Sequence, residues 1–362
     1  MWIKSLALTS FRNYSQLSLN FSPELNVFIG KNAQGKTNLL EAIYFLALTR
    51  SHRSRYDKDL IQFRKDAFTM QATICQEKGE VPVGISVNSS GRQISVNHLQ
   101  QRRLSQYLGT IRAILFAPED LQLIKGGPSL RRQFLDRDLG QLKSTYLSDL
   151  LNYRHILKQR NTYLKQTTDI NHDFLDVLDH QLADVGSRII KHRQDFVTHI
   201  NSFVNHHHSH MSHGSEELSV TYIPSISVDN HDIFNTFVNH LHQNRQKDSR
   251  YRSTEFGPHR DDLLFSINDI PARFASQGQQ RSIVLSIKLA EIDLMKETTG
   301  EAPLLLLDDV LSELDSSRQD MLLSNLHKGI QTFITTTNLD NLSPLPNTSK
   351  FFTITNGHVK TD

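Results

Sequence analysis

The amino-acid sequence predicts an α/β fold with an inserted helical lobe, and three observations carry this prediction. An apolar strand-like run at 25–29 leads through a glycine-rich turn into helical apolar spacing at 36–48. Four consecutive leucines at 304–307 are typical of a parallel strand that is covered on both faces. Between these segments, apolar residues repeat every 3.6 positions from Leu178 to Phe203, which indicates a long helix.

Composition limits the class of protein. The chain has 362 residues, enough for about two domains, and its formal net charge is +2. Because the charge is nearly balanced, any nucleic-acid surface must come from local clusters of basic residues. With Cys75 as the sole cysteine, a disulfide within the chain and a cysteine-based zinc site are excluded. The apolar runs are too short to span a bilayer and the first residues do not resemble a secretion signal, so we expect a cytoplasmic protein without a membrane partner.

The order of predicted elements indicates three parts. Residues 1–117 are expected to form the first part of the α/β lobe, 118–250 the helical lobe, and 251–362 the second part of the α/β lobe. The first part is expected to hold strands at 5–9, 17–21, 25–29, 68–75, 81–87 and 94–96, the last three in an antiparallel sheet. The helical lobe is expected to hold two antiparallel helices of about 25–35 residues, joined near 167–171, then an exposed histidine-rich loop at 205–215, a strand at 218–223 and a helix at 233–244.

An eight-residue motif between the first apolar strand and helix predicts a phosphate-binding loop. It matches the pattern G-x-x-x-x-G-K-[ST] without a mismatch. Its residues are Gly30, Lys31, Asn32, Ala33, Gln34, Gly35, Lys36 and Thr37. The glycines allow a tight turn whose N–H groups face phosphate oxygens, and the helix N-terminus adds about half a positive charge. We expect Lys36 to reach the β- and γ-phosphates of ATP and Thr37 to bind Mg²⁺; the alternative is a chance match in an ordinary loop.

Two acids follow the four leucines. In parallel sheets, residues at the carboxyl end of a strand emerge where ligands bind. We therefore expect Asp308 to contact Mg²⁺ and Asp309 to position or deprotonate the attacking water. The alternative is that both acids only cap the next helix, beginning near Ser312 or Asp315.

A third motif, from Ser276 to Arg281, precedes an apolar helical segment at 283–295. A serine–glycine turn that opens a helix is a second anion-binding arrangement, and the loop at 30–37 already wraps one phosphate chain. This order resembles the ABC ATPases, in which the signature turn of one protomer closes on the nucleotide held by the other. The resemblance implies that Ser276 and Gly278 act on the γ-phosphate held by a second copy, in an ATP-dependent homodimer.

Further segments extend the resemblance to the ABC ATPases. Ser312–Asp315 resembles their D-loop, and 335–337 occupies the switch position. Many ABC proteins have histidine at the switch, so here Thr337 or Asn338 is expected to substitute. Asp309 stands where fast ABC ATPases commonly have glutamate, and its shorter arm predicts slow hydrolysis. The separation of Thr37 from Ser276 is too short for the coiled-coil arms of the SMC and Rad50 relatives.

Within this superfamily, the chain resembles the RecF family of bacterial replication and repair proteins. Five stretches carry the resemblance: 11–14, 30–37, 116–136, 257–262 and 276–315. The resemblance implies a P-loop ABC-type ATPase head without a long coiled coil, and a weak, DNA-stimulated ATPase. It also implies binding to double-stranded DNA near single-strand gaps, and loading of a recombinase with RecR and RecO as partners. It leaves the histidine and arginine at 259–260 without an assigned role.

Basic residues in two segments are candidates for DNA contact. Residues 128–165 contain eight Lys or Arg against three Asp. A stripe of this kind can follow a phosphate backbone, and the alternative is an ordinary solvated face. The arginines just after the phosphate-loop helix are candidates because SMC-like relatives carry DNA-facing arginines nearby. The candidates are Arg50, Arg53, Arg131, Arg132, Arg154, Lys158 and Lys165.

Two other classes of function remain open from the sequence. A P-loop small-molecule or nucleotide kinase would act as a monomer, would not depend on DNA and would not need the turn at 276–280. A scaffold that binds nucleotide only for stability would not hydrolyse it.

Overall fold

The computed structural model describes most of the chain. The described residues are 1–77, 79–166, 171–227, 232–315, 318–322, 329–338 and 348–361. Their contacts divide the chain into two units: unit 1 consists of Met1–Asp120 with Lys288–Asp362, and unit 2 is Leu121–Ile287. The three-part division at 117 and 250 remains a prediction.

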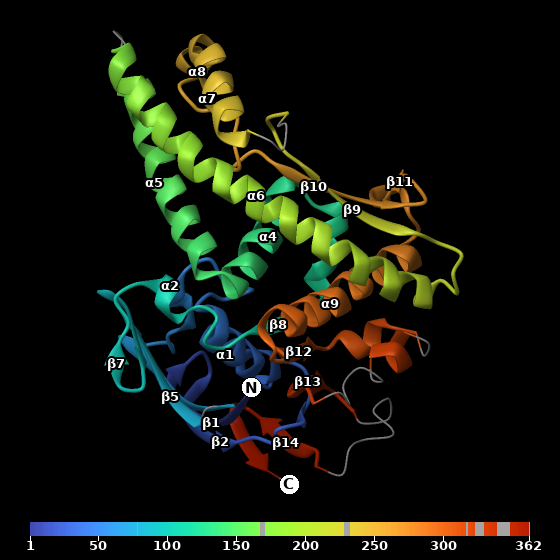
Figure 1. Cartoon of the computed structure of the whole chain (residues 1–362). Coiled ribbons are helices and arrows are strands. Elements are labelled where there is room, and N and C mark those ends of the chain that lie inside the picture. The colour runs from blue at the N-terminus through green and yellow to red at the C-terminus, as the bar shows by residue number, and fades with distance from the viewer. Residues whose placement is uncertain are drawn as a thin grey trace. The chain divides into compact units, whose positions relative to one another are not determined.

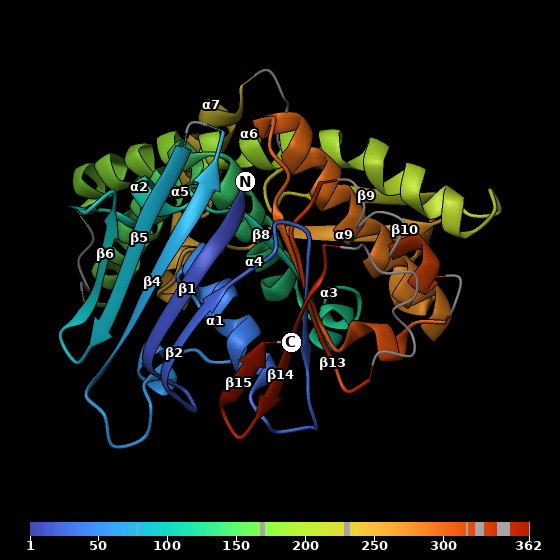
Figure 2. The same ribbon diagram turned by 90° about the horizontal axis from the view of Figure 1, so that it is seen from below.

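The first sheet of unit 1 is antiparallel and is built from N-terminal strands (Figure 2). In spatial order its strands are β2 (Tyr14–Asn20), β1 (Trp2–Phe11), β4 (Ala67–Gln76), β5 (Gly79–Asn88), β6 (Gly91–Val96) and β7 (Leu99–Gln100). Side chains alternate between core and solvent, so Met70 and Ala72 of β4 are buried whereas Thr69 and Gln71 are exposed. The antiparallel sheet predicted from 68–75, 81–87 and 94–96 is confirmed.

The second sheet of unit 1 is mostly parallel. In spatial order its strands are β15 (His358–Thr361), β14 (Lys350–Thr355), β3 (Leu25–Ile29), β13 (Thr332–Thr336), β12 (Leu304–Asp308) and β8 (Ala113–Phe116). Only the β14–β15 pair is antiparallel among these described strands. The four leucines of β12 are fully buried between β8 and β13, which confirms the predicted parallel strand with two covered faces.

Helix α1 (Lys36–Leu48) and both sheets share one apolar core in unit 1. The helix is buried on nearly every side, with Leu39, Ile43 and Phe45 fully enclosed. A helix that is apolar around its whole circumference belongs inside a protein, which explains its position. Short elements complete the unit: η1 (Asp57–Leu60), α2 (Leu104–Tyr107), η2 (Pro118–Leu121, ending in unit 2) and η4 (Val310–Glu313).

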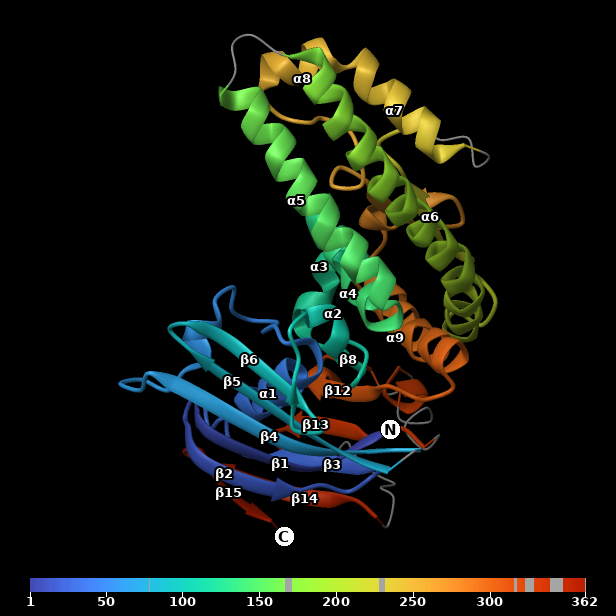
Figure 3. The ribbon, with the colours of Figure 1, turned by 60° about the vertical axis from the view of Figure 1, so that its left-hand side comes forward.

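Unit 2 is built mainly from helices (Figure 1). Its helices are α3 (Gln122–Lys125), α4 (Pro128–Leu142), α5 (Ser144–Gln166), α6 (His172–Met211), α7 (Ile233–Gln243) and α8 (Arg245–Tyr251). The two long helices α5 and α6 pack together, and α7 and α8 lie beside their ends (Figure 3). Helix α5 contains 23 residues and helix α6 contains 40. The expected length of about 25–35 residues was therefore too long for α5 and too short for α6.

A small sheet and a helix complete unit 2. The sheet order is β11 (Ile270–Pro271), β10 (Asp262–Ile267) and β9 (Leu218–Ile223), followed by η3 (Ala272–Phe274). Helix α9 (Gln277–Thr299) begins here and continues along the chain into unit 1. The described part of the chain contains no long coiled coil. Nor does any described helix have the length and apolar character to cross a membrane.

The histidine-rich segment corrects one expectation. Residues 205–211 continue α6 and are not a loop, because His208 is fully buried and bonded at both ring nitrogens. Its Nδ1 lies 3.2 Å from the Ser286 hydroxyl, and its Nε2 lies 2.9 Å from a carboxylate oxygen of Glu216. Burial therefore overrides the weak helix propensity of consecutive histidines. Most of the expected connection near 167–171 lies outside the described residues, although Asn171 caps α6 by accepting from Phe174 N at 3.0 Å.

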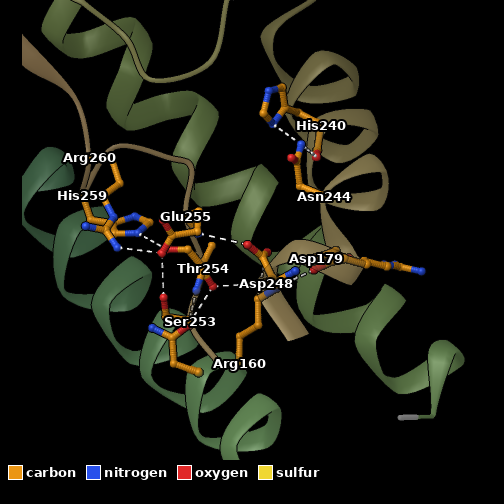
Figure 4. Close-up of polar contacts among 12 residues, drawn as sticks. Arg160, Asp179, His240, Asn244, Asp248, Ser253, Thr254, Glu255, His259 and Arg260 are labelled. Carbon is orange, nitrogen blue, oxygen red and sulfur yellow. Dashed lines mark hydrogen bonds and ion pairs between the residues drawn. The ribbon is translucent and has the colours of Figure 1, made fainter. Parts of the chain in front are cut away.

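A buried arginine joins three helices of unit 2 (Figure 4). Arg160 of α5 donates to Asp179 of α6 and to Asp248 of α8, each at 2.7 Å. It also donates to the Thr254 hydroxyl at 2.8 Å. Because all these groups are buried, the guanidinium replaces the water that the carboxylates lose on folding.

His259 lies next to this cluster and has a structural role. Its Nε2 is 2.9 Å from the Thr254 carbonyl oxygen and its Nδ1 is 2.8 Å from the Tyr153 hydroxyl. Burial lowers the pKa of His259 to about 4. Its neighbour Arg260 pairs with Glu255 at 3.0 Å (Figure 4). His259 and Arg260, which lie in the stretch 257–262 of the family resemblance, therefore hold the segment before β10 in place.

The low pKa of His259 predicts how stability depends on pH. The unfolded histidine titrates near 6.5, so between about pH 4 and 6.5 the unfolded chain binds a proton that the folded chain does not. Stability contributed by His259 is therefore complete above this window and decreases as the pH falls. We expect His259→Asn to reduce the pH slope of the unfolding free energy between pH 7 and 5, by up to about 1.4 kcal/mol per pH unit. Urea unfolding at both pH values measures this slope.

The matched control is His155→Asn, because His155 lies on the exposed face of α5. This variant should keep the wild-type slope. Equal slopes for the wild type and His259→Asn would contradict the prediction.

Candidate functional site

The predicted phosphate loop lies between β3 and α1 and is shaped by its two glycines. A Cβ at Gly30 would lie 2.4 Å from the carbonyl oxygen of Ile354 in β14, so a side chain cannot fit there. Gly35 has a φ of 117°, a conformation that favours glycine, and it caps α1. Both glycines of the motif are therefore required by the backbone, as the pattern predicted.

Lys36 is held over this loop. Its ammonium donates to the carbonyl oxygens of Gly30 at 2.5 Å and Lys31 at 3.0 Å. Partial burial lowers the pKa of Lys36 from its ordinary value, and the carboxylates of Asp309 and Asp308 oppose that shift. The Lys36 ammonium is therefore bound by the loop backbone and lies close enough to Asp309 and Asp308 to interact with their charges.

Two residues to which the sequence assigned no individual role support the loop. The Tyr14 hydroxyl donates to the Gly35 carbonyl at 2.9 Å, and Asn13 donates through Nδ2 to the Gln34 carbonyl at 3.3 Å. The Gln34 side chain in turn accepts from the backbone N–H of Asn356 at 2.7 Å. These contacts join the β1–β2 turn and the β14–β15 turn to the loop. Asn13 and Tyr14 both lie in the stretch 11–14, which carries part of the family resemblance. That resemblance is the sequence signal that could have identified them.

The structure brings Asp308 and Thr37 together. The Thr37 hydroxyl donates to Asp308 Oδ1 at 3.0 Å, although 271 positions separate the two residues. The same oxygen accepts from the Thr335 hydroxyl of β13 at 2.8 Å. Carboxylate and hydroxyl oxygens are ligands that Mg²⁺ uses beside nucleotide phosphates, so this donor set fits that ion. The sequence did not identify Thr335 as a partner of Asp308. It suggested only Thr337 or Asn338 as a substitute for the switch histidine.

Asp309 differs from its neighbour. Its side chain is exposed, its φ is +54°, and its backbone N–H donates to the Thr335 hydroxyl at 2.9 Å. Aspartate tolerates this left-handed conformation better than most residues, at a cost of about 1–2 kcal/mol. The turn separates the two carboxylates, so that Asp308 is held in the sheet and Asp309 faces solvent. Thr337 and Asn338 are both exposed, and the Asn338 carbonyl accepts from Thr336.

The signature turn lies in unit 2, at the N-terminus of α9. The Ser276 hydroxyl accepts from Gln279 N at 3.2 Å, and the Gln279 side chain accepts from Ser276 N at 2.8 Å. This reciprocal pair is a capping box. Ser276 is exposed and Gly278 is half-buried, so the turn is accessible from outside the chain. Ser276 is therefore available to a second molecule.

The arginines after α1 are placed differently from each other. Arg50 is exposed, whereas Arg53 donates to Asn38 at 2.9 Å and lies 3.8 Å from Glu41. Glu41 is a fully buried residue of α1 that sequence reasoning missed, and Arg12 binds both its carboxylate oxygens at 2.8 and 2.9 Å. Burial by itself raises the pKa of Glu41, but hydrogen bonds from Arg12 and the Ser51 hydroxyl outweigh it, and the pKa is lowered.

The basic candidates of unit 2 divide into inward and outward groups. Arg131 binds the Asp262 carboxylate at 2.6 and 2.9 Å, and Arg132 donates to the Asp261 carbonyl at 2.7 Å. These contacts join the stretches 116–136 and 257–262, two of the five that carry the family resemblance. The outward group lies on α5 and consists of Arg154, which pairs with Asp136 at 2.9 Å, and the exposed Lys158 and Lys165. DNA contact by either group remains a prediction.

The pair of the fully buried Glu41 with the partly buried Arg12 predicts a large effect on stability. Glu41→Gln keeps one acceptor oxygen but leaves the Arg12 charge without its counter-charge, so the unfolding free energy should fall by about 2–4 kcal/mol. Urea unfolding measures this loss.

The control is Glu80→Gln, because Glu80 forms an exposed pair with Lys4. Surface pairs contribute little, so this variant should unfold almost like the wild type. Equal losses for both variants would contradict the assignment of Glu41.

Comparisons with known proteins identify the family. The model of the RecF/RecN/SMC N-terminal domain matches residues 2–360. The chain is 55% identical to the DNA replication and repair protein RecF of Streptococcus uberis, and the match covers all of both chains. It is 53% identical to RecF of Streptococcus agalactiae serotype V, over 99% of this chain and 98% of that protein.

Solved structures agree with the sequence relatives. A structure of the recombination mediator protein RecF with ATP, in the RecFOR pathway, matches with a TM-score of 0.93 and 34% identity. The match covers 100% of this chain and 97% of that one. An Smc head bound to the winged-helix domain of ScpA shares the fold at a TM-score of 0.58 and 14% identity. The chain therefore belongs to the RecF family of DNA replication and repair proteins, with an ABC-type ATPase fold.

Proposed function

We propose that this chain is a slow, DNA-stimulated ATPase of recombinational repair and replication maintenance. It binds ATP and Mg²⁺, forms an ATP-dependent homodimer on double-stranded DNA near single-strand gaps, and helps to load a recombinase together with RecO and RecR in the bacterial cytoplasm. The observation that carries the proposal is the 3.0 Å contact of Thr37 with Asp308 beside the Lys36 ammonium. The relative solved with ATP supports the same ligand.

The nucleotide contacts follow from the loop. The backbone N–H groups of 30–37 and the Lys36 ammonium bind the phosphates, while Thr37 and Asp308 hold the cation. When bound, Mg²⁺ supplies charge neutralisation on the phosphate oxygens. Thr335 keeps Asp308 Oδ1 oriented through its 2.8 Å hydrogen bond. Asp309, exposed beside this site, orients the attacking water and accepts its proton.

The second half of the active centre comes from another copy of the chain. An exposed helix N-terminus with a serine hydroxyl suits a terminal phosphate, because its N–H groups and dipole favour an anion. Ser276 and Gly278 supply these groups to the γ-phosphate bound by the partner. Accessibility of Ser276 supports this arrangement, since a buried turn could not reach a second molecule.

Dimerisation that depends on this turn is directly testable. With a non-hydrolysable ATP analogue, Mg²⁺ and duplex DNA, the wild type should sediment as a dimer, and without nucleotide as a monomer. Ser276→Arg places a bulky cation in the contact, so the variant should remain monomeric and lose at least about tenfold of its DNA-stimulated hydrolysis. Analytical ultracentrifugation and phosphate release are the measurements.

Ser202→Arg is the control, because Ser202 is exposed on α6. A wild type that stays monomeric with the analogue but hydrolyses ATP would favour the monomeric kinase class. Absence of hydrolysis with and without DNA would favour the scaffold.

The length of the acid at position 309 predicts the hydrolysis rate. Asp309→Glu should hydrolyse ATP about threefold or more faster than the wild type, because the longer arm reaches the attacking water better. Asp309→Asn should lose at least about tenfold, because it cannot accept a proton. Single-turnover hydrolysis with duplex DNA separates this step from nucleotide exchange. An Asp309→Glu rate at or below that of the wild type would contradict the explanation for slow turnover.

A further inference from the structure

The segment 50–66 of unit 1 combines exposed rings with exposed cations. Phe63 is 85% exposed and Tyr56 is 57% exposed. The Arg64 guanidinium lies 5.5 Å from the centre of the Phe63 ring. The Lys58 ammonium lies 5.5 Å from the centre of the Tyr56 ring. Cation–π attraction of this kind orients a ring while leaving much of it in water.

The backbone of the segment is fixed to the first sheet. Leu60 is fully buried, and its carbonyl accepts from Arg12 N at 2.7 Å. Gln62 N donates to the Ser10 carbonyl at 2.8 Å, and Arg12 Nη1 donates to the Asp59 carbonyl at 2.7 Å. These anchors lie between the two rings in the chain. Tyr56 and Phe63 are therefore presented outward from a defined backbone.

The charge of the segment is predominantly positive. It contains six Lys or Arg against three Asp. One acid, Asp57, is already paired with Arg92. All six basic residues are exposed, and Arg53 lies near the Glu41 carboxylate. The other five form no ion pair with a described carboxylate; they are Arg50, Arg55, Lys58, Arg64 and Lys65.

We propose that Tyr56 and Phe63, with the cations around them, form a stacking surface for unpaired DNA bases. Free cations suit the phosphate backbone. The exposed rings gain nothing from phosphates, but they can stack on bases that are not enclosed in a duplex. A protein partner is less favoured, since docking on apolar side chains would leave five cations without counter-charges. The inference rests on the proposed DNA-binding function and deepens it, because it selects the single-stranded part of a gapped DNA.

The test compares three labelled DNAs of equal length: a duplex, a duplex with a single-strand gap, and a single strand. Fluorescence anisotropy is measured for the full chain with a non-hydrolysable ATP analogue and Mg²⁺. The double variant Tyr56→Ala/Phe63→Ala should bind the gapped and single-stranded DNAs at least about fivefold more weakly, the lower end of what stacking contributes. Its affinity for the duplex should stay within about twofold of the wild type.

Three further variants separate ring stacking from other roles. Tyr56→Phe/Phe63→Tyr keeps both rings and should bind the gapped and single-stranded DNAs like the wild type. Tyr56→Leu/Phe63→Leu keeps an apolar surface without rings and should bind like the alanine variant. Tyr251→Ala, which removes a 60% exposed tyrosine from unit 2, should bind like the wild type.

The outcomes distinguish the inference from the function on which it rests. If the alanine variant bound all three DNAs more weakly by the same factor, the segment would contact only phosphates, and the stacking role would be overturned. Rescue by the leucine variant would overturn it in favour of apolar docking to a protein. An unchanged alanine variant would also overturn it while leaving DNA binding intact. If the wild type bound none of the DNAs, the proposed function would fail and the inference with it.

Discussion

The proposed nucleotide site depends on one buried carboxylate, that of Asp308. It ends the strand β12, after four buried leucines, and accepts hydrogen bonds from Thr37 of α1 and Thr335 of β13. A charge can be buried at low cost only where such partners replace water. Both hydrogen bonds go to the same oxygen, Asp308 Oδ1. This oxygen therefore helps to fix the register of β12 with β13 and the position of α1. The same coupling places the Lys36 ammonium and the proposed cation ligands Thr37 and Asp308 at one edge of the sheet.

A second buried carboxylate joins this site to the surface of unit 1. Glu41 of α1 binds the Arg12 guanidinium, and Arg12 also donates to the Asp59 carbonyl in the segment 50–66. The helix that follows the phosphate loop and the proposed DNA-contact segment thus share one anchor. Because the same guanidinium contacts the segment and α1, displacement of the segment would disturb its pair with Glu41. Arg12 is therefore a physical link between the proposed DNA-contact segment and the helix that follows the proposed nucleotide site.

Unit 2 shows why a count of basic residues overstates the free positive surface. Arg160 is fully buried and binds Asp179 and Asp248, each at 2.7 Å. Arg131 and Arg132 join α4 to the segment before β10. The excess of basic residues in 128–165 therefore serves partly as internal connections. The outward candidates on α5, which are Arg154, Lys158 and Lys165, remain exposed to solvent and could contact a phosphate backbone.

Local patterns in the amino-acid sequence determined much of this protein. The glycine-rich turn at 30–37, the alternating strands and the leucine run of β12 were predictable because each depends on neighbours in sequence. The tertiary structure alone decided the pairing of Thr335 with Asp308, the burial of Glu41 and the helical state of the histidine-rich segment. Those features depend on partners distant in the chain. Burial makes these pairings strong, and a one-dimensional pattern carries no record of which distant groups become buried together.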